Sequence, residues 1–192
     1  MIEIVFATNN QHKIDEIQLV ITQDIKLKNL ISIGCNQELP ETHHTLEENA
    51  VEKATFITTH YNIDCFAEDT GLEVEALNGA PGVISARYAG THRSNDDNIS
   101  LLLRNMEGIE NRKARFRTVI ALLMNGKQHL FEGILEGTIA LQTHGDEGFG
   151  YDPVFQLADG RTLAELSKEE KGEISHRGIA TRKLVAFLSK NQ

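Results

Sequence analysis

The stretch Ile2-Glu-Ile-Val-Phe-Ala7, followed by Thr8-Asn-Asn-Gln-His-Lys13, decides the class of fold. Its first part is a β-branched, apolar run with the length and composition of a buried strand. After the polar residues 8–13, apolar side chains recur at helical spacing, at Ile14, Ile17, Val20 and Ile21. The chain therefore opens with a strand, a polar loop and a helix, which is how an α/β arrangement begins.

Further strands are expected along the chain. Short apolar runs predict strands at Leu30-Ile-Ser-Ile33 and Cys65-Phe-Ala67. Longer runs from about residue 116 to 124 and from about 129 to 141 are joined by Asn125-Gly126, a pair typical of a tight hairpin turn. Because helices alternate with strands early and a hairpin dominates the middle, we expect an α/β fold with a mixed central sheet.

Helices are expected where apolar spacing follows a capping residue. They are a helix from the pair Thr45/Glu48 to Tyr61, one from near Ser94 to Gly108, a short helix after the pair Thr162/Glu165, and a last helix from near Ser175. No repeat or Pro/Ser-rich linker interrupts the sequence, so we expect a single domain over residues 1–192.

The composition limits the classes of function. The 192 residues carry a formal net charge of −9, which argues against binding to duplex nucleic acid, because such binding relies on Lys and Arg. The longest clean apolar run, Val119–Met124, is far shorter than the about 20 residues of a membrane span. Cys35 and Cys65 are expected to be buried thiols in a reducing cytoplasm, and the acidic Met1-Ile-Glu3 does not resemble an export signal.

Two segments are candidates for binding a phosphate and a metal. Residues 8–13 lie at a helix N-terminus, where backbone N–H groups and Lys13 would face an anion; the alternative is a plain capped turn. Glu68-Asp-Thr-Gly71 follows the predicted strand at 65–67, so we expect these acids at the carboxyl end of that strand. Adjacent carboxylates point to opposite sides of a strand, so one of them would face a given site. Asp69 with Glu41 would suit Mg²⁺, and the alternative is an acidic surface turn.

Two segments further along the chain are candidates for binding a planar base. Phe149 and Tyr151 lie in the glycine-rich loop 145–152, where they would form either a stacking platform or a hydrophobic plug. His176 and Arg177 stand at a helix start, against the helix dipole, which suggests that an anion or a polar ligand edge offsets them. The alternative there is an ordinary cap by Ser175.

Together these segments resemble the family of noncanonical purine nucleoside triphosphate pyrophosphatases, the inosine/xanthosine triphosphate pyrophosphatases. The resemblance keeps its order through nearly the whole chain. It includes Thr8-x-Asn10-x-x-Lys13, Glu41, Glu48-Asn-Ala-x-x-Lys53-Ala54, Phe66-Ala-Glu-Asp-Thr-Gly-Leu72, Gly79-x-Pro-Gly-x-x-Ser-Ala-Arg-Tyr88, Gly148-Phe-Gly-Tyr-Asp-Pro153, Ala164-Glu165 and Lys171-x-x-Ile-Ser-His-Arg177. Two departures are Glu68, where many bacterial members have Asp, and Gly172, where many have Asn.

The resemblance implies hydrolysis of ITP, dITP and XTP to the monophosphate and pyrophosphate with Mg²⁺. It implies that Glu41 and Asp69 hold the metal and that Asp69 accepts the proton of the attacking water. Phe149 would stack on the base, and Asp152, His176 and Arg177 would lie near its polar edge. The substrate-binding residues it implies are Thr8, Asn9, Asn10, Gln11, His12, Lys13, Lys53, Thr70, Phe149, Gly150, Tyr151, Asp152, Lys171, His176 and Arg177. The implied fold is an elongated α/β molecule with a long central sheet and two lobes around a cleft, usually a homodimer.

Other functions stay open at this point. A related group of pyrophosphatases acts on methylated or pyrimidine nucleotides, but its opening is expected to read Ser-x-Ser-Pro-Arg, unlike Thr8 to Lys13. A second alternative is a nucleotide-sensing protein that binds without hydrolysis, against which the presence of Asp69, Glu41 and Lys13 speaks. From the residues alone, the default interpretation of Lys53 is a surface ion-pair partner, because it lies among Glu47, Glu48 and Glu52.

Overall fold

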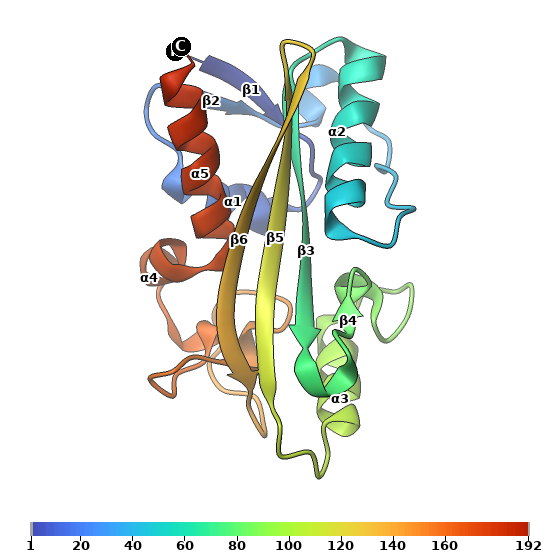
Figure 1. Ribbon diagram of the computed structural model, residues 1–192, viewed down its shortest axis with the longest axis vertical. Coiled ribbons are helices and arrows are strands. Elements are labelled where there is room, and N and C mark those ends of the chain that lie inside the picture. Colours follow the sequence, from blue (N-terminus) through green and yellow to red (C-terminus); the bar gives the residue numbers. More distant parts are fainter. Residues whose placement is uncertain (1, 192) are drawn as a thin grey trace.

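A long, curled sheet runs through the molecule and carries helices on both faces (Figure 1). The computed structural model describes residues 2–191, so Met1 and Gln192, the ends of the expected domain, lie outside the described residues. The strands are β1 (Ile2–Phe6), β2 (Ile25–Lys28), β3 (Cys65–Val74), β4 (Pro81–Gly82), β5 (Lys113–Met124), β6 (Lys127–Ile139) and β7 (Phe155–Gln156). Their order is β2-β1-β3-β5-β6-β7, and β4 pairs with β3.

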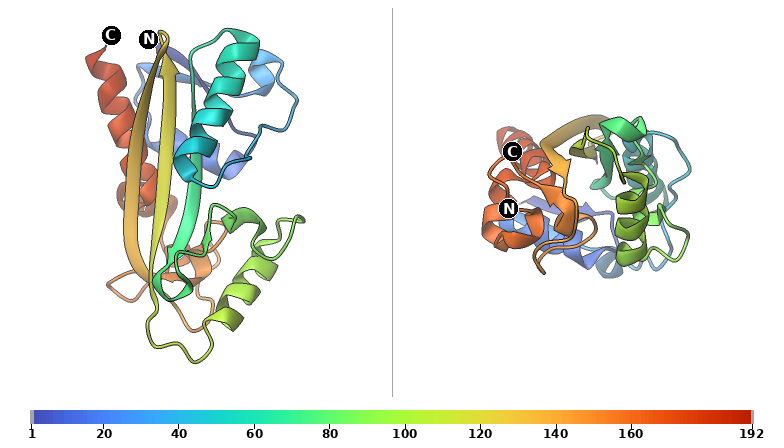
Figure 2. Two further views of the ribbon diagram at one scale, coloured as in Figure 1. Left: turned by 45° about the vertical axis from the view of Figure 1, so that its right-hand side comes forward. Right: turned by 90° about the horizontal axis from the view of Figure 1, so that it is seen from below.

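The helices are α1 (Gln11–Val20), α2 (Leu46–Tyr61), α3 (Asn95–Asn105), α4 (Lys168–Ile174) and α5 (His176–Lys190). Short 3₁₀ turns add η1 (Ile31–Ile33), η2 (Glu75–Leu77), η3 (Ser85–Arg87), η4 (Asp152–Val154) and η5 (Leu163–Glu165). Helices α1 and α5 lie on one side of the sheet and α2 on the other (Figures 1 and 2). No described helix is both long enough and apolar enough to cross a membrane.

The expected mixed sheet is confirmed. β1 runs parallel to β2 and β3, whereas β3, β5, β6 and β7 pair in antiparallel fashion. The hairpin between β5 and β6 turns at Asn125 and Gly126, which have φ of 51° and 72°. Such values suit the mirror-image turns that match the twist of a hairpin, so these two residues fix the register of the longest strands.

The prediction of a strand at Leu30–Ile33 is wrong. This segment is the turn η1, with Leu30 buried and Ile31 76% exposed, and Gly34 ends it at a φ of 75°. The actual strand is the earlier β2, which pairs with β1 from Ile2↔Ile25 onward. The sequence Ile-Lys-Leu-Lys of β2 alternates apolar and polar residues, a pattern typical of a strand with one covered face.

The other expected elements are present with changed limits. Thr45 caps α2 by accepting a hydrogen bond from Glu48 N, and the Thr162/Glu165 capping box starts η5. The strand expected at residues 65–67 extends to Val74, because β5 pairs with it along that whole length. Helix α4 was not expected, although Ser167 and Glu170 form a capping box at its start.

Three apolar clusters hold these elements together. One packs α2 against β1, β3 and β5, and a second packs α1 and α5 against the other face of the same strands. The third joins α3, the far halves of β3 and β5, and the segment around β7. The elements of the first two clusters form an upper lobe and those around α3 and β7 a lower lobe, as seen in Figure 1 and in the left view of Figure 2.

Candidate active site

The candidate site lies at an interruption in the pairing of β3. One edge of β3 pairs with β5 throughout, from Cys65 to Val74. The other edge pairs with β1 at residues 65 and 66 and with β4 at residues 72 and 73. Across the described residues, positions 67–71 have no strand partner on this second edge. A cavity of about 460 Å³ opens there between the two lobes.

The cavity gathers the predicted site residues from across the chain. All of the predicted metal-binding and substrate-binding residues line it except Gln11 and His12. Gln11 is exposed and donates a hydrogen bond to Asp15 at 2.7 Å. His12 is also exposed, but its ring stacks on that of Phe149, with centroids 5.1 Å apart. Separate loops and helices therefore converge on one hollow.

The acids of β3 lie in the middle of the strand, not at its carboxyl end as expected. Glu68 pairs with Ile120 and Asp69 with Val119, so both are held in the ladder with β5. Their carboxylates face opposite sides of the sheet, as the alternation of a strand requires. Asp69 faces the side covered by α2, and Glu68 faces the side covered by α1 and α5.

Asp69 and Lys53, both buried, form one cluster with the half-buried Glu41. Lys53 Nζ lies 2.7 Å from Glu41 Oε1 and 3.2 Å from Asp69 Oδ1, and Asn49 Nδ2 donates to Asp69 Oδ2 at 3.2 Å. Lys53 is 4% exposed, so its default interpretation as a surface residue is wrong. Burial raises the pKa of Asp69, although Lys53 and Lys13 oppose the rise. Burial alone would lower the pKa of Lys53, but Asp69 and Glu41 outweigh it and keep the amine charged.

Glu68 holds two cations on the other face of β3. Its carboxylate accepts hydrogen bonds from Arg177 Nε at 2.8 Å and Nη2 at 3.0 Å, and it lies 2.8 Å from Lys13 Nζ. Although burial acts to raise the pKa of Glu68, Arg177 and Lys13 keep it well below its usual range. Glu16 of α1 also pairs with Arg177 and lies 2.6 Å from Lys171. The charge of Arg177 at the start of α5 is therefore offset by two carboxylates of the protein itself.

Phe149 lies under two cationic groups, one from α4 and one from α5. Lys171 Nζ is 5.0 Å and Arg177 Cζ is 5.5 Å from the centroid of the Phe149 ring, distances typical of cation–π contacts. Asp152 fixes this arrangement, because its Oδ2 accepts a hydrogen bond from Phe149 N at 2.8 Å and one from Lys171 Nζ at 2.5 Å. Tyr151 is 4% exposed and packs in the lower core, with its hydroxyl donating to the Ser85 carbonyl. Tyr151 also borders the cavity, so it serves as a plug beneath the loop.

His176 is the least satisfied polar group of the site. Its ring stacks on Phe116, with centroids 4.5 Å apart, and its Nδ1 is buried without a hydrogen-bond partner among the described residues. Burial, together with the charges of Arg177 and Lys171, lowers the pKa of His176 well below its usual range. The ring is therefore neutral, and a buried nitrogen of this kind is costly unless a partner reaches it.

The loop after β1 is partly a capped turn and partly a lining of the cavity, so it combines features of both predicted alternatives. Asn10 Oδ1 accepts hydrogen bonds from His12 N at 3.0 Å and Lys13 N at 3.4 Å, so part of the helix N-terminus is capped by the protein. Thr8, Asn9 and Lys13 nevertheless line the cavity. The loop can therefore offer side chains to an anion, but four of its amides, those of Thr8, Asn10, His12 and Lys13, are already bonded.

Several lining or supporting residues were missed from the sequence. Arg87 of η3 lies 3.5 Å from Glu41 across the cavity, and Arg93 lies 3.0 Å from Glu38. Arg87 falls within the stretch 79–88 that carries the family resemblance, which was a usable signal. Glu16 had no such signal, because its role depends on where α1 meets α4 and α5.

The donor set can be tested for a metal. Glu41 and Asp69 both contact one ammonium group, so their carboxylates lie close together on the wall of the cavity. Carboxylate oxygens are ligands that Mg²⁺ prefers, usually together with waters and substrate phosphates. No cluster of three or more His, Cys, Asp or Glu that would suit a metal occurs in residues 2–191. The pair therefore fits a cation that keeps several non-protein ligands, and it does not form a closed structural site.

Known proteins resemble this chain over nearly its whole length. The model of the Ham1 family matches residues 4–187. A dITP/XTP pyrophosphatase of Flavobacterium psychrophilum is 53% identical, covering 96% of this chain and 98% of that protein. One of Porphyromonas gingivalis is 49% identical, covering 98% of each. The solved structure of the Staphylococcus aureus Ham1 protein superposes with a TM-score of 0.91 at 40% identity, covering 100% of both chains. The chain belongs to the Ham1 family.

Proposed function

We propose that this protein hydrolyses noncanonical purine nucleoside triphosphates, namely ITP, dITP and XTP, to the monophosphate and pyrophosphate. The observation that carries the proposal is that one cavity is lined both by a lysine–carboxylate group and by an aromatic ring under two cations. Lys53, Glu41 and Asp69 form one group of its lining, Phe149, Lys171 and Arg177 form another, and Lys13 lies beside Arg177 on Glu68. Relatives described as dITP/XTP pyrophosphatases support the same activity.

The charges of the cavity suit an anionic substrate. Its described lining includes six cationic side chains against four carboxylates, whereas the whole chain carries a formal net charge of −9. A triphosphate would therefore meet local positive charge in a protein that is negative elsewhere. When bound by Glu41 and Asp69, Mg²⁺ would supply charge neutralisation for the phosphates and make water more acidic.

Asp69 is the residue of this chain that would take the proton. In the proposed reaction a water oxygen forms a bond to the α-phosphorus, and the bond from that phosphorus to the bridging oxygen breaks. The electron pair of that bond leaves with pyrophosphate, and the Asp69 carboxylate accepts the proton of the water. Lys53, held between Asp69 and Glu41, and Lys13 would stabilise the charge that develops on the phosphates.

The donors around Phe149 suit a 6-oxo purine. An ammonium group has three N–H donors. Lys171 uses two of them, on Glu16 and Asp152, and therefore retains one for a ligand. His176 Nδ1 is a further unpaired group in the same region. A 6-oxo purine presents an acceptor beside a donor, whereas adenine presents the reverse. A buried site built for the first would leave groups unpaired with the second, which can give a discrimination of about 10⁴-fold or more.

The experiment that tests this function is pyrophosphate release from ITP, XTP, GTP, ATP and dTTP, with and without Mg²⁺. The proposal expects Mg²⁺-dependent release from ITP and XTP and little from ATP. Equal rates on ATP and ITP would contradict the specificity, preferential use of dTTP would favour the pyrimidine-directed group, and nucleotide binding without release would favour a sensor.

The proposal also includes a cytoplasmic homodimer, which rests on the family resemblance alone. A monomeric mass in sedimentation equilibrium would contradict the dimer.

A further inference from the structure

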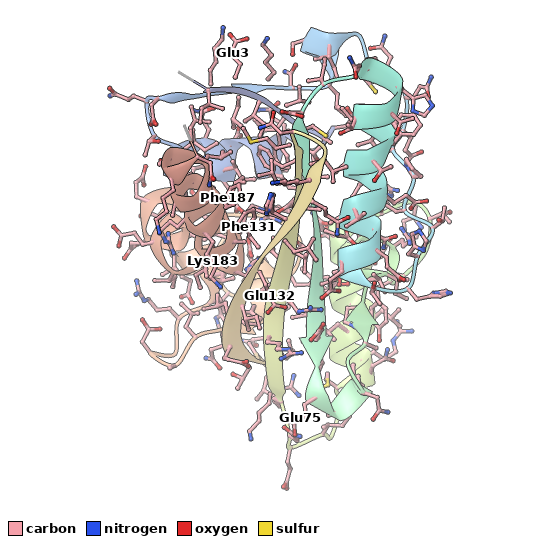
Figure 3. The ribbon with its side chains drawn as sticks, turned by 45° about the horizontal axis from the view of Figure 1, so that its top comes forward. Glu3, Glu75, Phe131, Glu132, Lys183 and Phe187 are labelled. Carbon is pink, nitrogen blue, oxygen red and sulfur yellow. The ribbon has the colours of Figure 1, made fainter. Side chains whose placement is uncertain are left out.

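Helix α5 lies along β6 and comes closer to it toward the N-terminal end of the helix. Near the other end, the rings of Phe187 and Phe131 lie between helix and strand, with centroids 5.5 Å apart (Figure 3). One turn earlier, Lys183 Nζ donates a hydrogen bond to the carbonyl of Glu132 at 2.7 Å (Figure 3). Side chains therefore fill the space between α5 and β6 in this part.

At the N-terminal end of α5, no side chain separates the helix from β6, because the facing residue of the strand is Gly133. It follows Phe131 by two residues and so lies on the same face of β6. A Cβ at Gly133 would lie 1.9 Å from the carbonyl oxygen of His176 and 2.7 Å from the nitrogen of Ala180. Real Cβ contacts are not shorter than 3.0 Å, so any side chain at Gly133 would push the first turn of α5 away by about 1 Å.

Gly178 brings the same turn into contact with α4. A Cβ at Gly178 would lie 2.1 Å from the carbonyl oxygen of Gly172 and 3.2 Å from Ser175 Oγ. Neither Gly133 nor Gly178 has a positive φ, so lack of space and not backbone conformation demands glycine. Alanine ordinarily stabilises a helix more than glycine does, so Gly178 lowers the intrinsic stability of α5. The close contact with α4 gives a reason for keeping glycine at this position.

These two glycine contacts set the position of the groups around Phe149. Helix α4 carries Lys171, and the first turn of α5 carries His176 and Arg177. We propose that Gly133 and Gly178 are positioning residues for base recognition, because they allow the first turn of α5 to rest directly on β6 and on α4. This inference rests on the proposed function, since it assumes that these side chains meet the base.

The inference separates base recognition from phosphate chemistry. Asp69, Lys53 and Glu41 lie on the side of β3 that is covered by α2, away from α5. A shift of α5 by about 1 Å would misplace donors toward the base, and misplacement of that size can cost about 100-fold. The loss should therefore be mainly in affinity and selectivity for the base, with the group of Asp69, Lys53 and Glu41 retained.

The test uses Gly133→Ala and Gly178→Ala in the full chain. Steady-state hydrolysis of ITP and ATP gives KM and kcat, and calorimetric titration with IMP gives a Kd that needs no turnover. We expect the KM for ITP and the Kd for IMP to rise by about 10- to 100-fold, kcat for ITP to change far less, and the ITP over ATP preference to fall. Gly133→Val, with a larger side chain, should raise both constants further.

The matched control is Gly172→Ala. A Cβ at Gly172 would have nothing within 4 Å, so the same substitution next to Lys171 should leave KM, Kd and kcat unchanged. Leu184→Ala, in the core contact of α5, should lower Tm without changing KM. If Gly133→Ala does not fold, Gly178→Ala tests the same placement from the side of α4.

The outcomes distinguish this inference from the proposed function. KM and Kd values equal to those of Gly172→Ala would overturn the inference, and so would a lower kcat at unchanged KM, because that result reports only fewer folded molecules. A wild-type protein that binds IMP but releases no pyrophosphate from ITP would contradict the proposed function. In that case the inference would be decided by the Kd for IMP alone, compared between the Gly133 and Gly178 variants and Gly172→Ala.

Discussion

The carboxylates of Glu68 and Asp69, neighbours in β3, point to opposite faces of the sheet. Glu68 binds Lys13 and Arg177, whereas Asp69 binds Lys53. One short stretch of strand thus anchors cations from both sides of the sheet around a single cavity. The two acids consequently have different expected roles, one in holding the site together and the other in the reaction.

Replacing Asp69 should stop the reaction without unfolding the protein. Asp69→Asn removes the proton acceptor, and loss of a general base typically lowers kcat by about 10²- to 10⁴-fold. Glu41 still neutralises Lys53 in this variant, so the buried ammonium keeps a partner. Pyrophosphate release from ITP and thermal melting of the two proteins measure both effects. Near-normal kcat would remove Asp69 from its proposed role.

Replacing Glu68 should instead destabilise the fold. Glu68→Gln removes the two-bond carboxylate partner of the buried Arg177 and leaves Glu16 as its remaining carboxylate, and breaking a buried ion pair from one side costs up to about 3–5 kcal/mol. Urea unfolding at neutral pH gives the free energy of unfolding. Glu73→Gln, a change of the same kind at the far end of β3, is the control. Equal stability of the Glu68→Gln variant and the control would show that the pair contributes little.

Glu16 should make stability depend on pH. Burial by itself would raise its pKa, but Arg177 and Lys171 outweigh burial and hold the pKa of Glu16 below its ordinary value of 4.5. A lowered folded pKa stabilises the protein at pH values above the unfolded pKa, and this contribution disappears as the pH falls through the folded pKa. Glu16→Gln should therefore lower the free energy of unfolding by about 1–3 kcal/mol at pH 7.

The pH series for this variant is the decisive part of the measurement. Urea unfolding of wild type and Glu16→Gln from pH 7 to pH 3 should show a difference that shrinks as the solution becomes more acidic. A difference that stays constant over this range would mean that the charge of Glu16 does not contribute. Asp15→Asn, an exposed neighbour on α1, controls for the loss of one negative charge.

Replacing Phe149 should weaken binding of the base. The ring already accommodates one planar group, His12, at a stacking distance of 5.1 Å. Stacking of a base on an aromatic side chain contributes about 1–3 kcal/mol, so Phe149→Ala should raise the KM for ITP by about 5- to 100-fold. Phe149→Tyr should retain most of the affinity. An unchanged KM in Phe149→Ala would leave Phe149 as a packing residue only.

Much of the fold could be predicted from local patterns. The opening strand and helix, the hairpin at Asn125-Gly126 and the capped helices α2 and α5 depend on neighbouring residues, so apolar spacing and turn residues were sufficient. Helix α4 was missed although its capping box is local, but the errors in the strands occurred where partners are distant in the sequence. The end of β3 is set by pairing with β5, and β2 is defined by pairing with β1, neither of which a local window contains.

The sequence by itself determined which residue types the site contains and in what order, because motifs such as Thr8-x-Asn10-x-x-Lys13 are read directly from the chain. Only the tertiary structure decided that Lys53 is buried and that two carboxylates offset the charge of Arg177. The reason is physical. The periodicity of a strand or helix is a local property of the chain, whereas burial and charge pairing depend on which distant segments share one space.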